Sequence, residues 1–290
     1  MKIAVLGPIA KDNVKVDNNL STQIGGIPYY IAVALKSLEI EKITPYITCG
    51  AEDSQWVRDN FDGLDVKCLL VEKTLESNLE YSSNNPDERK HLIYCYPNTI
   101  EASPKLLKEL ENYDYIILGP LFHDNIPFDL FTKLKHKNLV LGNFGMFTYG
   151  ENGKFVRKNP ENLVNVIPFL KYLFLDRGEA EFVSKNSTVD GAAKFFQNYG
   201  LSNIIITEGS KGSHLFLGKK YYQIPAFKPL SIVDPTGAGD TYLASFVRAL
   251  GLFDNPYEQG RFAAMVATMS LENAGAFRKN INEVLARLDI

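Results

Sequence analysis

Cysteine is scarce in this chain, with only Cys49, Cys68 and Cys95 among 290 residues. The number is odd and the spacings match no metal-ligand pattern, so neither a disulfide framework nor a zinc site is expected. Met1 and Lys2 run directly into the strand-like I-A-V-L, which leaves no room for a signal peptide. Both observations predict a reduced, cytoplasmic protein.

Long hydrophobic runs and blocks of like charge are also missing. No apolar stretch approaches the length of a membrane span, so no membrane partner is expected. Lys and Arg number 31 against 34 Asp and Glu, for a formal net charge of −3, and they are interspersed. A nucleic-acid partner is therefore not expected either.

What the chain does contain is short apolar runs that alternate with helical patterns. Runs that suit strands buried on both faces occur at 3–6, 43–47, 115–118, 139–141, 172–175 and 204–207. Helical periodicity is clear at 27–38 and after Asp240. This alternation predicts an α/β domain with helices on both faces of a mostly parallel sheet.

Two segments break the alternation, at 13–24 and 66–99. Both contain strand-like pieces without a convincing helix. The polar N-N-P-D-E-R-K at 84–90 is typical of a hairpin tip. We expect these segments to form a small β-sheet lid, and the rest of residues 1–290 to form the core of one domain.

One motif, D-P-T-G-A-G-D at 234–240, combines small residues with two carboxylates. An apolar run precedes it and an amphipathic helix follows it, which places Gly237, Ala238 and Gly239 at a helix N-terminus. The free N–H groups and positive dipole there favour an anion. Asp240 would repel that anion, so it is either a helix cap or a catalytic group, and the motif alone favours neither. The chain contains no P-loop motif, and the segment from Gly237 lacks the third glycine of a dinucleotide-binding motif.

The sequence resembles the PfkB, or ribokinase-like, family of carbohydrate and nucleoside kinases. Its V-D-P-T-G-A-G-D-T-Y-L-A-S-F at 233–246 is similar to the C-terminal signature of that family, and G-G-I-P-Y-Y-I-A-V-A-L at 25–35 resembles the N-terminal one. Weaker matches occur in the same order at 7–12, 175–181 and 206–212. The resemblance implies a three-layer α/β/α core with a small β lid.

The resemblance also implies a reaction. Asp240 matches the catalytic base that takes the proton of the acceptor hydroxyl as it attacks the γ-phosphate of ATP. Gly237, Ala238 and Gly239 match the anion hole for that phosphate. A carboxylate at the positive end of a helix is expected to be a weak base, which suffices because phosphoryl transfer depends mainly on positioning and charge stabilisation.

Donor and ion positions carry over in the same way. Glu179 matches the acidic residue that holds Mg²⁺ through water, although it also suits the first turn of a helix. Asp176 stands where the family usually has Asn, which leaves its role open. Thr207, Gly209 and Gly212 match the ATP-binding loop, or are an ordinary strand-end turn. Asp234 and Thr236, with the loop around 274–275, match a monovalent-cation site for K⁺.

On the acceptor side, Asp12, Gly25 and Gly26 match residues that bind sugar hydroxyls. Tyr30 stands where the family commonly has Asn, and it also suits plain core packing. Lys11 is the one basic residue that could turn inward, so an uncharged sugar or polyol is expected. A nucleoside is the alternative acceptor, and a non-catalytic sugar or nucleotide sensor the alternative class. An open lid further predicts a homodimer through paired lids.

Overall fold

In the computed structural model, residues 1–16, 19–82, 85–94 and 98–289 are described. A sheet of nine strands within these ranges forms the centre of the molecule, in the order β15-β14-β13-β12-β9-β8-β1-β4-β5. Its strands are β1 (Lys2–Pro8), β4 (Lys42–Gly50), β5 (Lys67–Val71), β8 (Tyr115–Leu118), β9 (Asn138–Gly142), β12 (Leu170–Asp176), β13 (Asn203–Thr207), β14 (Ser213–Leu217) and β15 (Lys220–Ile224).

The run from β5 to β13 is parallel, and β14 and β15 are antiparallel additions at one edge. All six predicted buried strands are present in it, as β1, β4, β8, β9, β12 and β13. Their apolar runs are buried because helices cover both faces of the sheet.

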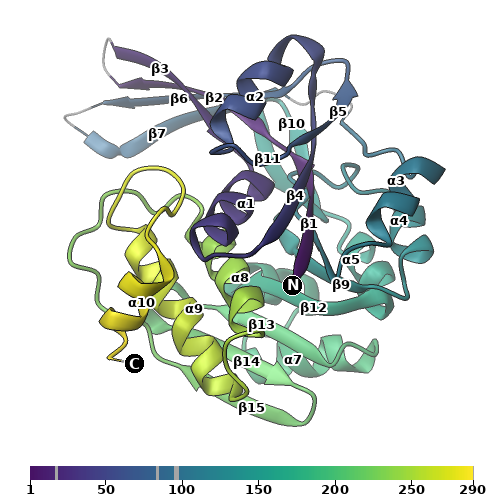
Figure 1. Cartoon of the computed structure of the whole chain (residues 1–290), viewed down its shortest axis with the longest axis vertical. Helices are drawn as coiled ribbons and strands as arrows, with labels where there is room; N and C mark the ends of the chain where they lie inside the picture. Colours follow the sequence, from purple (N-terminus) through teal and green to yellow (C-terminus); the bar gives the residue numbers. More distant parts are fainter. Residues whose placement is uncertain (17–18, 83–84, 95–97, 290) are drawn as a thin grey trace.

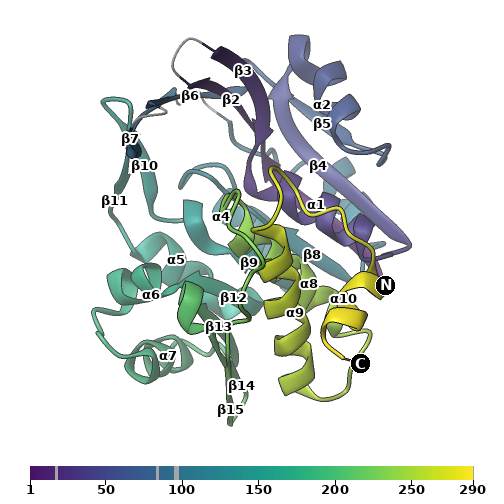
Figure 2. The same cartoon turned by 90° about the vertical axis from the view of Figure 1, so that its left-hand side faces the viewer.

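Helices form the outer two layers (Figures 1 and 2). One face packs against α1 (Ile27–Ser37), α2 (Ser54–Asn60), α8 (Ala238–Ala249), α9 (Pro256–Ser270) and α10 (Ile281–Arg287). The other packs against α3 (Pro104–Leu110), α4 (Phe128–Lys133), α5 (Glu161–Val166), α6 (Arg177–Ser184) and α7 (Val189–Asn198). Short 3₁₀ turns complete the core: η1 (Ala51–Asp53), η2 (Asn143–Gly145), η3 (Ile167–Phe169) and η4 (Gly209–Lys211). The three-layer α/β/α prediction is confirmed.

A second, four-stranded sheet projects from the core at the upper left of Figure 1. It contains β2 (Ala10–Val16), β3 (Asn19–Gly25), β6 (Leu75–Ser82) and β7 (Asn85–Tyr94), in the order β3-β2-β6-β7. A separate hairpin, β10 (Thr148–Glu151) and β11 (Lys154–Arg157), reaches the base of β7, where the Ile93 N–H donates to the Gly153 carbonyl.

The predicted lid boundaries need two corrections. The segment 67–71, placed in the lid from the sequence, is β5 at the edge of the main sheet, because α2 allows a crossover that pairs it parallel to β4. Residues 85–90, predicted as a hairpin tip, belong to β7. The remaining tip residue 84, and Cys95, lie outside the described residues.

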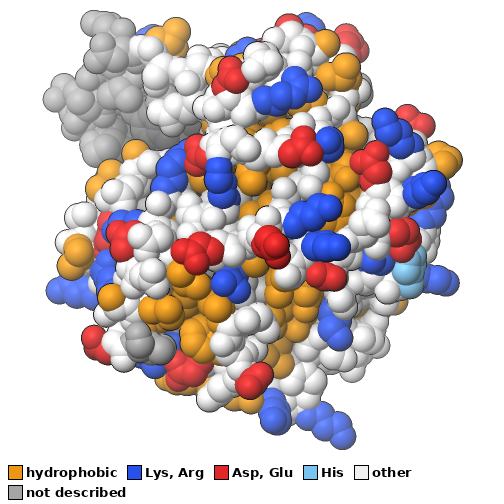
Figure 3. Space-filling model, in the orientation of Figure 1, with side chains coloured by type: hydrophobic (Ala, Val, Ile, Leu, Met, Phe, Trp, Pro, Cys, Tyr) orange, Lys and Arg blue, Asp and Glu red, His pale blue; other side chains and the backbone are white. Residues whose placement is uncertain are grey.

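None of the helices in the described ranges combines the length and apolar character that a membrane crossing requires. On the face in Figure 3, basic and acidic side chains are interspersed.

Candidate active site

The N-terminus of α8 carries the glycine motif, and its first glycine is needed for packing. Gly237 caps the helix in a left-handed conformation, with φ of 74°. A Cβ added there would overlap the ring of Tyr30 in α1. Gly237 is therefore required by its backbone conformation and by its neighbour.

Gly239 differs, because a Cβ added there would meet nothing within 4 Å. Its neighbours in the protein do not require glycine. The N–H groups in this first turn have no intrahelical carbonyl to bond, and the helix dipole adds positive potential. Open space beside such donors fits a phosphate group of a ligand.

Asp240 follows directly and faces a cavity of about 160 Å³. Burial raises the pKa of its carboxyl from 3.8 to about 7. Burial therefore makes this carboxylate a stronger base than its position at a helix start alone predicts. A group with this pKa accepts a proton readily near neutral pH.

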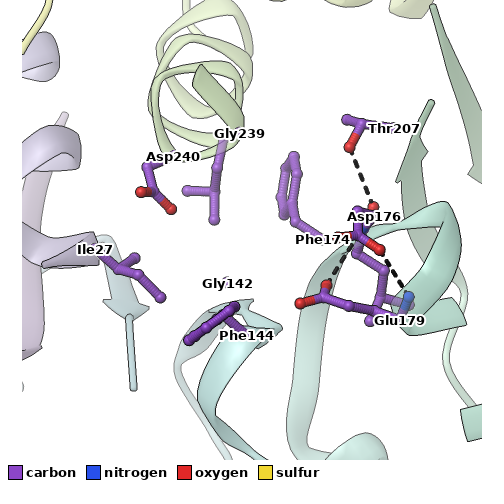
Figure 4. Close-up of a pocket in the computed structure, with 11 residues that line it drawn as sticks. Ile27, Gly142, Phe144, Phe174, Asp176, Glu179, Thr207, Gly239 and Asp240 are labelled. Carbon is purple, nitrogen blue, oxygen red and sulfur yellow. Dashed lines mark hydrogen bonds between the residues drawn. The ribbon is translucent and has the colours of Figure 1, made fainter. Parts of the chain in front are cut away.

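Glu179 enters the same cavity from the opposite side, from the first turn of α6 (Figure 4). Asp176 and Glu179 form a capping box: the Glu179 N–H donates to Asp176 Oδ1 at 2.7 Å, and the Asp176 N–H donates to Glu179 Oε2 at 3.0 Å. Burial, with a smaller contribution from the charge of Asp176, raises the pKa of Glu179 to about 8. The prediction that Glu179 occupies the first turn of a helix is therefore confirmed, and the second oxygen of its carboxylate takes no part in the capping box.

Carboxylate oxygens are suitable partners for Mg²⁺ or for the water around it. Within the described ranges, no three His, Cys, Asp or Glu side chains are grouped closely enough to hold a metal ion. Any Mg²⁺ at this site must therefore receive most of its ligands from the triphosphate and from water.

A larger cavity of about 550 Å³ adjoins the first and shares Thr207 and Gly239 with it. Gly209, Gly212 and Ala238 also line it, so the structure brings the predicted ATP-loop residues to the same helix end. The rest of its wall is mainly apolar: Ala226, Phe227, Pro229, Ile232, Pro235, Tyr242, Ala264, Ala267 and Leu271. Such a wall suits a flat, apolar ring.

Asp12 lies on β2 of the lid, where the Ser77 hydroxyl donates to its Oδ1 at 2.5 Å. Burial raises the pKa of Asp12, and the bond from Ser77 partly opposes this. A Cβ on Gly25 would collide with the Asp12 carboxylate, and one on Gly26 would collide with the backbone around Ile9. The double glycine therefore makes room for Asp12 and for the start of α1.

Tyr30 is 7% exposed, and it packs edge-to-face on Tyr29 as well as against Gly237. Burial raises its pKa, and the charges of Asp12, Asp234 and Asp240 raise it further. The core-packing alternative describes this contact well. The same contact also places the ring between the residues expected to bind the acceptor and those expected to bind phosphate.

Asp234 joins two loops near the start of α8. Its Oδ1 accepts the Thr236 N–H at 2.9 Å, and its Oδ2 accepts the Gly275 N–H at 3.3 Å. The predicted cation-site residues, including those around 274–275, are thus brought together. Lys11 turns the other way, forming an ion pair with buried Asp53 at 2.5 Å beside Trp56.

Sequence reasoning missed several residues of the first cavity, namely Ile27, Gly142, Phe144, Phe174 and Leu243. Gly142 and Phe144 could have been predicted from the sequence. They follow the predicted strand 139–141, and residues at the carboxyl ends of parallel strands commonly line such sites. The others are core residues by pattern, and only the fold places them at the cavity.

The parallel sheet covered on both faces, the projecting β lid and the helix α8 with Asp240 in its first turn are features of the ribokinase fold. The sequence matches the pfkB family carbohydrate kinases over residues 4–282, and the chain belongs to this family.

Three comparisons show the range of similar proteins. A nucleoside kinase of Methanocaldococcus jannaschii is 32% identical over 117 residues, which cover 40% of this chain and 37% of that protein. A ribokinase structure from Thermotoga maritima has a TM-score of 0.79 at 22% identity, with both chains fully covered. A pyrophosphate-dependent kinase complexed with a pyrophosphate analog and myo-inositol has a TM-score of 0.80 at 21% identity, covering 98% of this chain and 99% of that one. The chain spans about two fifths of the length of the nucleoside kinase that it matches.

Proposed function

We propose that this protein transfers the γ-phosphate of ATP to a hydroxyl group of an uncharged sugar or polyol. One observation carries the proposal: Gly239 lies in the wall of both cavities, with Asp240 beside it in the smaller one. A donor whose base occupies the larger cavity would therefore present its phosphates to the start of α8.

The proposed reaction is an in-line transfer. The acceptor oxygen bonds to the γ-phosphorus while the bond to the bridging oxygen of ADP breaks, and ADP keeps that electron pair. The acceptor proton passes to the Asp240 carboxylate. The N–H groups of the first turn of α8 stabilise the phosphate oxygens. Glu179 would hold Mg²⁺ through water, and the ion would supply charge neutralisation for the triphosphate.

The size and wall of the larger cavity support a nucleotide donor over pyrophosphate. Pyrophosphate alone needs no apolar wall, whereas Phe227 and Tyr242 can contact an adenine ring. We expect ATP to give at least a 100-fold higher kcat/KM than pyrophosphate. Equal use of the two donors would contradict this assignment of the cavity.

An uncharged acceptor is favoured because the basic residue nearest to Asp12 in sequence is engaged elsewhere. Lys11 is paired with Asp53, and a dianionic phosphosugar left without a cation in a closing site would be costly. The similarity to a nucleoside kinase makes a nucleoside the second candidate. Either acceptor could hydrogen-bond to Asp12 and pack against Tyr30.

The test is a competition among sugars, inositols, nucleosides and phosphosugars at equal concentrations, with ADP release as the readout. A neutral polyol should give the highest kcat/KM. A higher value for fructose 6-phosphate or another phosphosugar would overturn the proposed pocket. Binding without ADP release for the whole panel would favour a sensor.

A reducing, cytoplasmic location fits the thiols. Cys49 and Cys68 are both free, although their side chains are close enough to hydrogen-bond. An oxidising compartment would favour their pairing.

A further inference from the structure

The smaller cavity is lined by acidic residues, although the proposed substrate is an anion. Asp176, Glu179 and Asp240 line it, and none of its described lining residues is basic. A triphosphate carries about four negative charges and one Mg²⁺ offsets two of them, so a further cation should stabilise it.

Arg157 does not itself line this cavity, but it lies beside Asp176, which does. It is the last residue of β11, in the hairpin that Figure 2 shows above α5 and α6. Its Nη2 lies 3.9 Å from Asp176 Oδ2, and its Nη1 would lie 3.6 Å from a Cβ on Gly178. The guanidinium also covers the ring of Phe147 at 5.9 Å. It therefore sits against the first turn of α6, and its charge lowers the pKa of Glu179 against the effect of burial.

Two arginines near the start of α6 differ in whether their guanidinium groups already have hydrogen-bond partners. The guanidinium of Arg177 donates to Glu208 Oε1 at 2.7 Å and to the Ser187 carbonyl. The guanidinium of Arg157 makes no hydrogen bond with another described residue, and its separation from Asp176 exceeds hydrogen-bond length. Arg157 is 38% exposed at the side chain, so its donors are available to a ligand.

We propose that Arg157 binds the γ-phosphate of the donor and stabilises the charge on its oxygens during transfer, and that Asp176 keeps the guanidinium beside the cavity. This inference rests on the proposed kinase function. It also gives a role to Asp176, where the family usually has Asn: an amide would cap α6 equally well but could not attract an arginine.

The test compares two ligands that differ by one phosphate. Calorimetry with Mg²⁺, and no acceptor, would measure the affinity of ADP and of the non-hydrolysable β,γ-imido analogue of ATP for the full chain. In Arg157→Gln, the affinity for the analogue should fall at least 10-fold and that for ADP less than 3-fold. The kcat should fall about 100-fold, below the effect of a fully enclosed arginine finger.

Matched variants separate this role from a structural one. Lys158→Gln removes the adjacent cation, which pairs with Glu151 at the surface, and should leave both affinities within 2-fold. Arg157→Lys keeps the charge and should recover part of the lost kcat. Asp176→Asn should lower the affinity for the analogue more than that for ADP, with the melting temperature retained.

Equal losses for ADP and the analogue in Arg157→Gln, or a kcat within 3-fold of wild type, would overturn the inference. If Arg157→Gln does not fold, the same comparison is made with Arg157→Lys. A lysine cannot form the paired hydrogen bonds of a guanidinium with the γ-phosphate, so this variant should also lose affinity for the analogue and not for ADP. Absence of ATP-dependent turnover in the wild type would instead refute the proposed function, while the binding ratio would still test Arg157.

Discussion

At the scale of single residues, two effects act in opposite directions on the pKa of Asp240. The start of a helix stabilises a negative charge, whereas burial destabilises it, and here burial dominates and raises the pKa to about 7. The result is a carboxylate that is basic enough to accept a proton beside a site suited to anions.

Replacing Asp240 with Asn keeps its size and removes the proton acceptor. Loss of a general base costs about 10²–10⁴ in rate, so we expect kcat to fall at least 100-fold while ATP still binds. The measurement is ADP release at saturating acceptor, with Asp190→Asn as the control, because Asp190 occupies the first turn of α7 away from the cavity. Near-normal turnover would remove Asp240 from the mechanism.

The raised pKa of Asp240 also predicts two pH dependences. For activity, kcat/KM should rise with pH through about 7, as Asp240 loses its proton. The stability of the folded protein should change in the opposite direction. The pKa of Asp240 is higher in the folded than in the unfolded chain, so the stabilisation that comes from its protonated form is complete below about pH 4 and is lost as the pH rises through 7. Asp240→Asn should therefore be more stable than wild type at pH 8, by up to roughly 4 kcal/mol, and no more stable at pH 4. Thermal unfolding at both pH values is the measurement, and no gain at pH 8 would contradict the pKa.

At the scale of elements, the start of α6 makes Glu179 both a helix-capping residue and the proposed partner of Mg²⁺. Glu179 completes a capping box with one carboxylate oxygen and leaves the other for the cavity. Glu179→Gln keeps an oxygen for the cap but removes the ability to become a negatively charged carboxylate when Mg²⁺ binds. We expect its melting temperature to stay within about 2 °C of wild type, while the Mg²⁺ concentration needed for half-maximal activity rises at least 5-fold. An unchanged Mg²⁺ requirement would restrict Glu179 to capping, and EDTA should abolish activity in either protein.

The loops before α8 and after α9 form a second element to which the sequence assigned a role, that of a cation site. Asp234 links them through the Thr236 and Gly275 N–H groups, which positions the carbonyl-rich backbone of both loops. We propose that K⁺ binds there and raises activity by ordering the start of α8. In sodium-free buffer, K⁺ should stimulate wild type and leave Asp234→Ala unaffected. Equal wild-type rates with and without K⁺ would exclude this cation site.

At the scale of the whole molecule, the lid sheet has two unlike faces. Strand register places Asp12 and Ser77 on one face, and Leu20, Leu92 and Tyr94 on the other. These three side chains are 73%, 46% and 42% exposed, and polar residues such as Asn13 and Asn78 lie on the same face, so a second protein surface would cover a mixed face with exposed apolar groups. We propose that two lids pair through this face to form a homodimer.

Sedimentation at micromolar concentration should give the mass of a dimer, and Leu20→Asp should shift it toward the monomer because a charge would be buried in the interface. Ser21→Asp is the control, since it adds the same charge to the same strand on the opposite face of the sheet. A strictly monomeric wild type would contradict this assembly.

Much of the fold could be predicted from sequence because its signals are local. Buried parallel strands appear as short apolar runs, and a helix start after D-P-T-G-A-G appears as a switch to helical periodicity. The placement of Gly237, Gly239 and Asp240 at that start followed from seven consecutive residues. The strand at 67–71 was assigned to the lid and belongs to the edge of the main sheet, because a short apolar run does not indicate which of two sheets the strand joins.

Tertiary structure decided what depends on residues far apart in the chain. The pKa of Asp240 follows from burial by segments that the motif does not contain. The contact between Tyr30 and Gly237 joins two signatures, and the approach of Arg157 to Asp176 joins a hairpin to a helix. Sequence patterns report which backbone a short segment can adopt, whereas electrostatics and packing depend on distances in space. For that reason the motif was enough to predict a phosphate site, whereas the pKa of Asp240 and the charges around it depend on the folded chain.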